Sequence, residues 1–148
     1  SEQVLVKDID LVSGVERELL LNDFGVGKVI SFDKTKTLHG LVQKQVLKTP
    51  EAIALVFEGA TMTYGELDER ANVLADELIE MSCGQFVGLY LDRGFEMIIS
   101  IVAVLKSGNA YVPISPEYPQ QRSEFILEDA GVKVLLTSCI HSGKFSSV

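Results

Sequence analysis

Two glycine–lysine stretches are the first candidates for phosphate chemistry in this chain of 148 residues. Gly25-Val-Gly27-Lys28 has the glycines and the cation of a phosphate cradle, but no convincing strand precedes it and no helix begins at its end. Ser142-Gly143-Lys144 lacks the earlier glycine of the P-loop pattern, in which backbone N–H groups surround the phosphates. We interpret the first stretch as a connector and expect neither to bind a nucleotide.

The histidines and cysteines are too scattered for nucleophilic or metal chemistry. A nucleophile needs a base beside it, but we expect His39 to be a half-buried structural residue of an amphipathic helix, and His141 falls in a polar C-terminal stretch. Cys83 and Cys139 belong to no C-x-x-C pair, which argues against tetrahedral zinc and favours free thiols in a reducing compartment. We predict no catalytic residue, no cofactor-binding residue and no metal ligand.

The charge pattern excludes some partners. Residues 51–148 carry six Lys or Arg against fourteen Asp or Glu, whereas residues 1–50 carry seven of each, and the net charge is −8. An acidic surface repels phosphate backbones, so nucleic-acid binding is disfavoured. The sequence contains no apolar run of the roughly 18 residues that a membrane span requires and no signal-peptide pattern. We therefore expect a cytoplasmic protein without a membrane partner.

The first elements must position whatever chemistry the chain has. Residues 11–23 contain Ser13 and Glu16 at the spacing of a capping box, which predicts a short helix, and residues 24–37 are interpreted as a connector. A second helix begins after Thr37 and ends before Pro50. Its predicted apolar face consists of Leu38, Leu41, Val42 and Val46.

The best-specified helix follows a predicted strand at residues 52–57 and a hairpin turn at residues 58–60. Thr63 and Glu66 have the spacing of a capping box, while Met62 and Leu67 have that of a hydrophobic staple. The other face carries Asp68, Glu69, Asn72, Asp76 and Glu80, and we expect it to face water. The apolar stripe of this helix is Leu67, Ala71, Leu74 and Leu78.

From residue 86 onwards the predicted elements alternate. The pattern indicates strands at 86–91, 110–114 and 132–137, with helices at 94–108 and 119–131 between them. Strands and helices that alternate with short connections predict an α/β fold built from parallel βαβ units. The 94–108 helix is apolar on nearly every side, so we expect it to be buried between layers. Residues 138–148 are predicted to be a frayed end.

Two motifs in these elements resemble those of a known family. LKSGNAYVPI at residues 105–114 resembles the L-K-A-G-x-A-Y-V-P-[LI]-D motif of non-ribosomal peptide synthetase adenylation domains, and Pro116-x-Tyr118-Pro119-x-x-Arg122 matches its continuation. MTYGEL at residues 62–67 looks like the family's L-T-Y-x-E-L motif. Ser115 stands where the family usually has Asp, and the loop at residues 81–85 is shorter than the family's Gly-x-x-x-Gly-Asp turn and lacks its Asp.

The resemblance implies an arrangement of domains. Residues 16–22 are similar to the segment that joins condensation and adenylation domains, so residues 1–36 are predicted to be that linker. Residues 37–148 are predicted to be the N-terminal part of an adenylation domain, within the N-terminal subdomain of an adenylate-forming (ANL-type) enzyme. In the family, the phosphate loop, the amino-acid pocket and the catalytic lysine come later, and none of them occurs before Val148.

The family's activity gives the expected function of a larger parent protein. Its adenylation domains use ATP and Mg²⁺ to convert an amino acid to an aminoacyl adenylate, and they load it on the phosphopantetheine thiol of a carrier domain. We expect this chain to be scaffold and inactive alone, with condensation and carrier domains as partners. Small MbtH-like helper proteins dock near the motif in some members. A helper surface would include Tyr111, Pro113, Tyr118 and Phe125.

The residues of the motif itself have structural interpretations. Lys106 lies near the C-terminus of a predicted helix, where it offsets the helix dipole more readily than it reaches a nucleotide. Gly108 is expected in a left-handed conformation, and Pro113 at a strand end or sheet edge. Arg122 is interpreted as an ion-pairing surface or interdomain residue.

Several alternatives stay open at this point. The chain could belong to another adenylate-forming ligase, such as an acyl-CoA synthetase, or be a non-catalytic scaffold or protein-binding module. It could be an expressed fragment, a truncated gene product or one part of a split enzyme. The amino acid selected, the oligomeric state and the need for a helper protein do not follow from the sequence.

Overall fold

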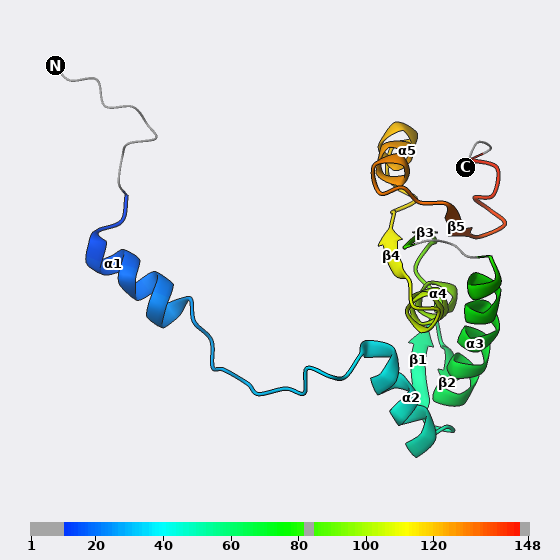
Figure 1. Ribbon diagram of the computed structural model, residues 1–148, viewed down its shortest axis with the longest axis horizontal. Coiled ribbons are helices and arrows are strands. Elements are labelled where there is room, and N and C mark those ends of the chain that lie inside the picture. The colour runs from blue at the N-terminus through cyan, green and yellow to red at the C-terminus, as the bar shows by residue number, and fades with distance from the viewer. Residues whose placement is uncertain (1–10, 82–84, 146–148) are drawn as a thin grey trace. The chain divides into compact units, whose positions relative to one another are not determined.

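The computed structural model describes residues 11–81 and 85–145. The chain divides into two units, Ser1–Lys34 and Thr35–Val148 (Figure 1). The division falls near the predicted boundary at residue 36. Nothing in the described part of the chain is a helix both long and apolar enough to cross a membrane. The loop at residues 81–85, predicted to turn differently from the family's, falls largely outside the described residues.

The first unit contains the predicted N-terminal helix. It begins as α1 (Gly14–Glu18) and continues as the π-helix η2 (Leu19–Phe24). The Ser13 hydroxyl accepts a hydrogen bond from the Glu16 backbone N–H at 3.3 Å, as its capping position predicts. Neither helix has a buried residue. Residues 25–37 form neither helix nor strand, which confirms the connector.

The second unit opens with helix α2 (Leu38–Lys48), capped by the Thr37 hydroxyl, which accepts from the Gly40 N–H at 3.2 Å. The antiparallel strands β1 (Ile53–Phe57) and β2 (Ala60–Thr63) follow. The turn between them, Glu58-Gly59, has φ angles of 49° and 81°. Positive φ at both central residues is the geometry of a tight hairpin turn, so the predicted hairpin is confirmed.

Three further helices flank a parallel sheet. They are α3 (Tyr64–Glu80), α4 (Phe95–Lys106) and α5 (Gln120–Asp129), shown in Figure 1. The capping box of α3 is complete, since Thr63 accepts from the Glu66 N–H and Glu66 accepts from the Thr63 N–H at 2.8 Å.

The sheet contains β3 (Phe86–Tyr90), β4 (Ala110–Pro113) and β5 (Val134–Thr137) in the order β4-β3-β5. Both pairings are parallel. The predicted α/β class with parallel βαβ units is therefore confirmed. Pro113 is the last residue of an edge strand, where its missing N–H leaves no ladder bond unmade.

Side chains alternate between two cores along β3. Val87 and Leu89 belong to a cluster with α3 and α4, whereas Tyr90 belongs to a second cluster with Leu127 of α5. This period of two is what a strand covered on both faces requires. Gly88 faces the second cluster, where a Cβ would lie 2.7 Å from the Leu135 side chain, so glycine lets α5 pack closely on the sheet.

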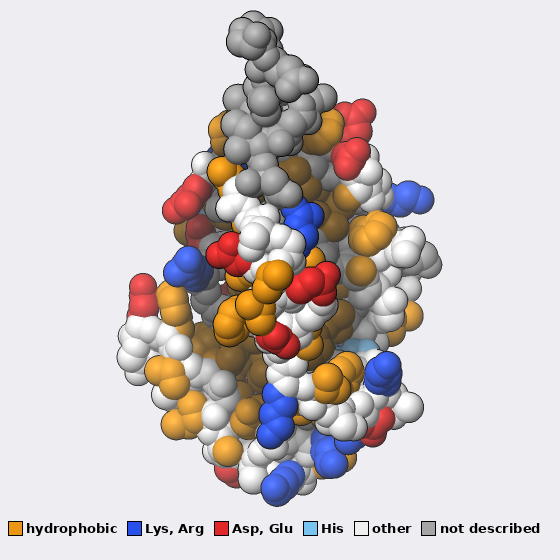
Figure 2. Space-filling model, turned by 90° about the vertical axis from the view of Figure 1, so that its left-hand side faces the viewer, with side chains coloured by type: hydrophobic (Ala, Val, Ile, Leu, Met, Phe, Trp, Pro, Cys, Tyr) orange, Lys and Arg blue, Asp and Glu red, His pale blue; other side chains and the backbone are white. Residues whose placement is uncertain are grey.

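Two predictions about burial are corrected. The inward positions of α2 are His39, Val42, Gln45 and Val46, which are half-buried, while Leu38 and Leu41 are 69% and 47% exposed. The apolar face predicted for α2 is thus rotated, because the positions of α3 and α4 select which side is covered. Figure 2 shows hydrophobic side chains scattered over the face that it draws. The second correction concerns residues 138–145, which fold against β3 instead of fraying.

Candidate functional site

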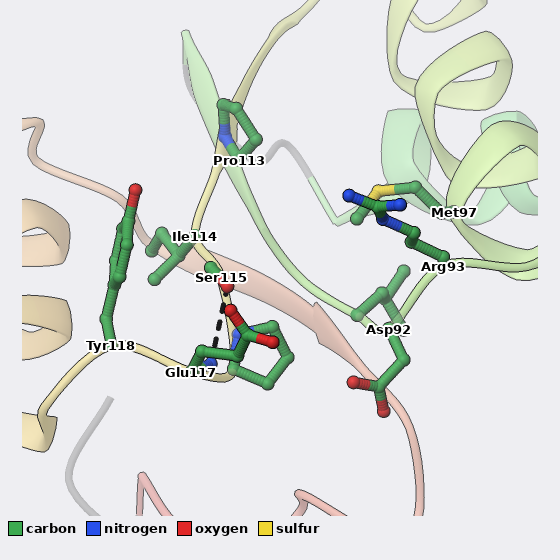
Figure 3. A pocket seen from close by; sticks show the side chains of 10 residues that line it. Asp92, Arg93, Met97, Pro113, Ile114, Ser115, Glu117 and Tyr118 are labelled. Atoms are coloured by element: carbon green, nitrogen blue, oxygen red, sulfur yellow. Dashed lines mark hydrogen bonds between the residues drawn. The ribbon is translucent and has the colours of Figure 1, made fainter.

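The described part of the second unit has a cleft at the carboxyl ends of β3 and β4, with a volume of about 440 Å³ (Figure 3). We call it the carboxyl-end cleft. Loops that follow parallel strands converge at this edge of a sheet, where α/β folds commonly bind ligands. One wall is Leu91 to Arg93, after β3, and the other is Pro113 to Tyr118, after β4; Met97 of α4 closes the side.

The wall after β4 is a tight turn built by Ser115. Its hydroxyl accepts from the Glu117 N–H at 3.3 Å, and its carbonyl accepts from the Tyr118 N–H at 3.0 Å. Asp and Ser side chains both accept such bonds from the backbone two residues ahead. Ser115 therefore does what the family's Asp would do for this turn, but it places no carboxylate in the cleft. The Arg122 guanidinium lies over the Tyr118 ring, 4.4 Å from its centroid, and thereby stabilises the start of α5.

The wall after β3 is held from behind by residues 138–145. The Asp92 carboxylate lies 2.8 Å from His141 Nε2, and in Figure 3 it is directed away from Ser115. Only 15% of the His141 side chain is exposed. His141 was predicted to lie in a frayed end, so this pairing was missed. Its signal in the sequence is weak, because nothing near Asp92 in the chain indicates a partner 49 residues away.

Lys106 of the LKSG motif is a buried structural cation. Its side chain is 6% exposed, and its ammonium forms an ion pair with Asp68 and donates to Asn72 Oδ1 at 2.6 Å. Both partners belong to α3, on the side that we expected to face water; Asn72 is exposed as expected, whereas Asp68 is half-buried and the expectation is wrong for it. Lys106 also lies in the last turn of α4, where the helix dipole favours a cation. It thus joins α4 to α3.

The other residues of the motif also have structural roles. Gly108 has φ of +79°, the left-handed conformation predicted for it. Tyr111 packs against the cluster formed with α3 and α4, while Phe125 is 65% exposed on α5 and Tyr118 is 37% exposed. The four residues considered for a helper surface are therefore not equally available, since Tyr111 faces a core.

The glycine–lysine stretches do not form a phosphate site in the structure. Gly25-Val-Gly27-Lys28 lies in the extended connector of the first unit. Lys144 is engaged with Tyr90, whose hydroxyl lies 2.9 Å from the ammonium. Over residues 11–81 and 85–145, no three His, Cys, Asp or Glu side chains gather in a group able to hold a metal ion.

His39 and Cys139 have no catalytic setting in the described structure. His39 is half-buried, as predicted, and its Nε2 lies 3.2 Å from the Thr37 hydroxyl at the start of α2. Cys139 is an exposed free thiol. Hydrogen bonds from the Thr63 backbone and hydroxyl lower the pKa of the Glu66 carboxyl.

Comparison with known proteins identifies a family, which the geometry of the site alone does not. The AMP-binding enzyme family matches residues 42–147. Gramicidin S synthase 2 of Brevibacillus brevis is 43% identical over 90% of this chain, and bacitracin synthase 1 of Bacillus licheniformis is 41% identical over 93% of it. The chain spans 3% of the length of each of these relatives.

Solved structures give the same result. The non-ribosomal peptide synthetase FmoA3 in its AMPPNP-bound form matches 89% of this chain at 29% identity with a TM-score of 0.72, and the match covers 14% of FmoA3. The N-terminal subdomain of NpsA from Klebsiella oxytoca matches 71% of this chain at 26% identity with a TM-score of 0.65, and the match covers 28% of that subdomain's chain. These matches confirm the resemblance drawn from the LKSGNAYVPI and MTYGEL motifs.

Proposed function

Because the chain belongs to the AMP-binding enzyme family, we propose that it forms the first part of an amino-acid-activating adenylation domain in a larger synthetase. In that parent protein, the carboxylate of an amino acid attacks the α-phosphate of ATP, an aminoacyl adenylate forms and pyrophosphate leaves. The aminoacyl group then passes to the phosphopantetheine thiol of a carrier domain. The synthetases above support this proposal, as does FmoA3, which is also solved with α-methyl-L-serine-AMP bound.

The role of this chain within the parent is structural. The observation that carries this conclusion is the position of Lys106, the one cation of the LKSG motif, which is buried in contact with Asp68 and Asn72. A lysine engaged in this way is not available to developing phosphate charge. The motif thus sets how α4, β4 and the start of α5 are arranged, and it leaves catalysis to other parts of the domain.

The cofactors and partners follow from the same proposal. The proposal assigns ATP and Mg²⁺ to the full domain of the parent and no cofactor to this chain. Condensation and carrier domains of the same assembly line are the expected partners, and the cytoplasm is the expected location. A helper protein of the MbtH-like type would use the exposed part of the proposed surface, namely Phe125 and Tyr118 with the edge residue Pro113.

Pyrophosphate exchange with a panel of amino acids tests the proposal. We expect the parent protein to catalyse ATP–pyrophosphate exchange with one or a few amino acids and this chain alone to show only background exchange. Robust exchange by the chain alone would refute the scaffold role. A parent that exchanges only with fatty acids, and forms acyl-CoA, would instead support the alternative ligase.

A binding experiment tests the remaining alternative, in which the chain is a non-catalytic binding module. If the parent shows no exchange with any acid, but the chain retains a helper or carrier protein in a pull-down without ATP, the chain is a non-catalytic binding module. Phe125→Ala is the matched variant for this pull-down, because Phe125 is 65% exposed and its loss leaves the two cores unchanged. Val73→Ala on the exposed side of α3 is the control.

A further inference from the structure

We propose that residues 138–145, which we call the C-terminal strap, are coupled to the carboxyl-end cleft, so that a movement of the strap changes the shape of the cleft. Buried Tyr90 is the residue that connects the two. The proposal depends only on contacts within the chain. A parent without pyrophosphate exchange would leave it intact, so its failure and that of the proposed function are distinguishable.

Tyr90 holds the strap through its ring. It is 1% exposed at the end of β3. The His141 ring meets it edge to face with centroids 5.4 Å apart and an interplanar angle of 81°, and Phe145 does so at 4.9 Å and 84°. Edge-to-face pairs at these distances are favourable beyond the area that they bury. The two aromatic residues therefore fix the strap on one buried side chain.

The Tyr90 hydroxyl connects the strap to the turn after β4. Lys144 Nζ donates to this hydroxyl at 2.9 Å, and the hydroxyl in turn donates to the Pro116 carbonyl at 3.3 Å. Pro116 lines the cleft, inside the turn that Ser115 builds. A change in the position of Lys144 thus reaches the cleft wall through one buried hydroxyl.

A second connection reaches the opposite wall. His141 Nε2 and Asp92 Oδ2 are 2.8 Å apart, and Asp92 lines the cleft. The groups placed against His141 by these contacts are Asp92 from the loop after β3 and Tyr90 from β3 itself, and Lys144 Nζ lies 5.4 Å from the centroid of the Tyr90 ring. The strap therefore contacts one residue on each wall, directly in one case and through Tyr90 in the other.

The strap is suited to move as a unit. It contains no helix or strand, and residues 142–144 are exposed. It is attached to β3 and the cleft through the side chains of His141, Lys144 and Phe145. Segments held by a few side-chain contacts open at low free-energy cost. Release of the strap would free Asp92 and remove the Lys144 bond to the Tyr90 hydroxyl that holds Pro116, and the two walls would then relax.

Amide hydrogen exchange tests the coupling. We compare the chain with Lys144→Met and Tyr90→Phe, and Lys133→Met is the control because Lys133 is exposed beside β5. Lys144→Met removes the hydrogen bond from the strap to Tyr90, and Tyr90→Phe removes that bond together with the one to the Pro116 carbonyl. We expect exchange at the amides of Glu117 and Tyr118 to rise about three- to tenfold, together with exchange in the strap. The control should change neither region.

The results decide between coupling and independent contacts. Faster exchange in the strap with unchanged exchange at residues 117 and 118 would overturn the proposal. His141→Ala sharpens the test, because it removes the Asp92 contact and should raise exchange at residues 92–94 more than at 117 and 118. If His141→Ala leaves residues 92–94 unchanged, the contact with Asp92 does not hold that wall and the proposal is wrong. Lys144 is exposed, so Lys144→Met decides the question even if Tyr90→Phe is unstable.

Discussion

Helices α2 and α4 have similar lengths and are both rich in apolar residues, yet only α4 is enclosed. In α4, five residues are buried and only Glu96 is exposed. In α2 no residue is buried, and Leu38, Leu41 and Leu47 are 69%, 47% and 87% exposed. Both helices end with a lysine in the last turn, but Lys106 is buried in an ion pair whereas Lys48 is exposed.

The difference shows where the fold of this chain is complete. Helix α4 is covered by α3 on one side and by the sheet on another, so its environment lies within the chain. Helix α2 and the outward residues of β1, Ile53 and Val56, leave apolar side chains in water. Large exposed apolar patches mark interaction surfaces. This pattern agrees with the proposal that the chain is part of a larger domain.

The largest expected effect is in the core around α4. Leu78→Ala removes a side chain that is 1% exposed against α4, and we expect the free energy of unfolding to fall by about 3 kcal/mol. Urea denaturation measures it. Val73→Ala, on the exposed side of the same helix, is the control and should change stability by less than about 0.5 kcal/mol. Equal losses for both would mean that α3 is not packed as described.

The lysines in the last turns of α4 and α2 give the next comparison. Lys106→Met leaves the Asp68 carboxylate half-buried without its partner, so we expect a loss of about 2 kcal/mol. Lys48→Met in the last turn of α2 should cost less than about 0.5 kcal/mol. A double-mutant cycle with Asp68→Asn isolates the pair. A cycle with no coupling energy would show that Lys106 acts through the helix dipole alone.

The N-caps of α3 and α2 should also differ in how much they stabilise the chain. Thr63→Ala breaks the complete capping box of α3, and we expect a loss of about 1 kcal/mol. Thr37→Ala removes the cap of α2, where Thr37 accepts from Gly40, and the loss should be about half as large because α2 contributes less packing. Thermal unfolding followed by circular dichroism measures both. A larger loss for Thr37→Ala would reverse the ranking of the two helices.

Acid should weaken the start of α3. The Thr63 backbone and hydroxyl lower the pKa of Glu66 below its ordinary value of 4.5 in the folded chain. A folded-state pKa below the unfolded one adds stability above the unfolded pKa, and that stability is lost as the pH falls through the folded value. Glu66→Gln should therefore make unfolding less dependent on pH below about 4.5. An unchanged pH dependence would contradict the bond from Thr63.

The smallest effect is expected on the exposed face of α2. Leu41→Ser should change the free energy of unfolding by less than about 0.5 kcal/mol, because Leu41 is 47% exposed in this chain. Urea denaturation measures this change. In the parent protein the same substitution should cost more, since the proposed domain covers this face. Equal costs in both contexts would show that the face stays in water.

Much of the local structure was predictable because local chemistry determines it. The capping box of Thr63 and Glu66, the Glu58-Gly59 turn and the left-handed Gly108 each depend on residues a few positions apart. The alternation of strands and helices after residue 86 predicted the parallel sheet, since short connections allow few other arrangements. The motif around Lys106 identified the family without indicating the contacts that Lys106 makes.

The errors all involve residues that are far apart in the chain. Lys106 meets Asp68 across 38 positions, and His141 meets Asp92 across 49. No periodicity encodes such a pair. The predictions that Asp68 faces water and that His141 lies in a frayed end were therefore wrong. The face of α2 was also misplaced, because the sequence contains more apolar positions than α3 and α4 can cover.

The sequence by itself determined the elements, their caps and turns, the α/β class and the family, because each depends on short-range patterns or on the motifs. Tertiary structure alone decided that Lys106 is buried against α3, that Tyr90 joins the strap to the turn after β4, and that His141 contacts Asp92 on the other wall of the cleft. Burial and pairing depend on which surfaces meet after the helices pack on the sheet. They therefore emerge only when the chain is folded.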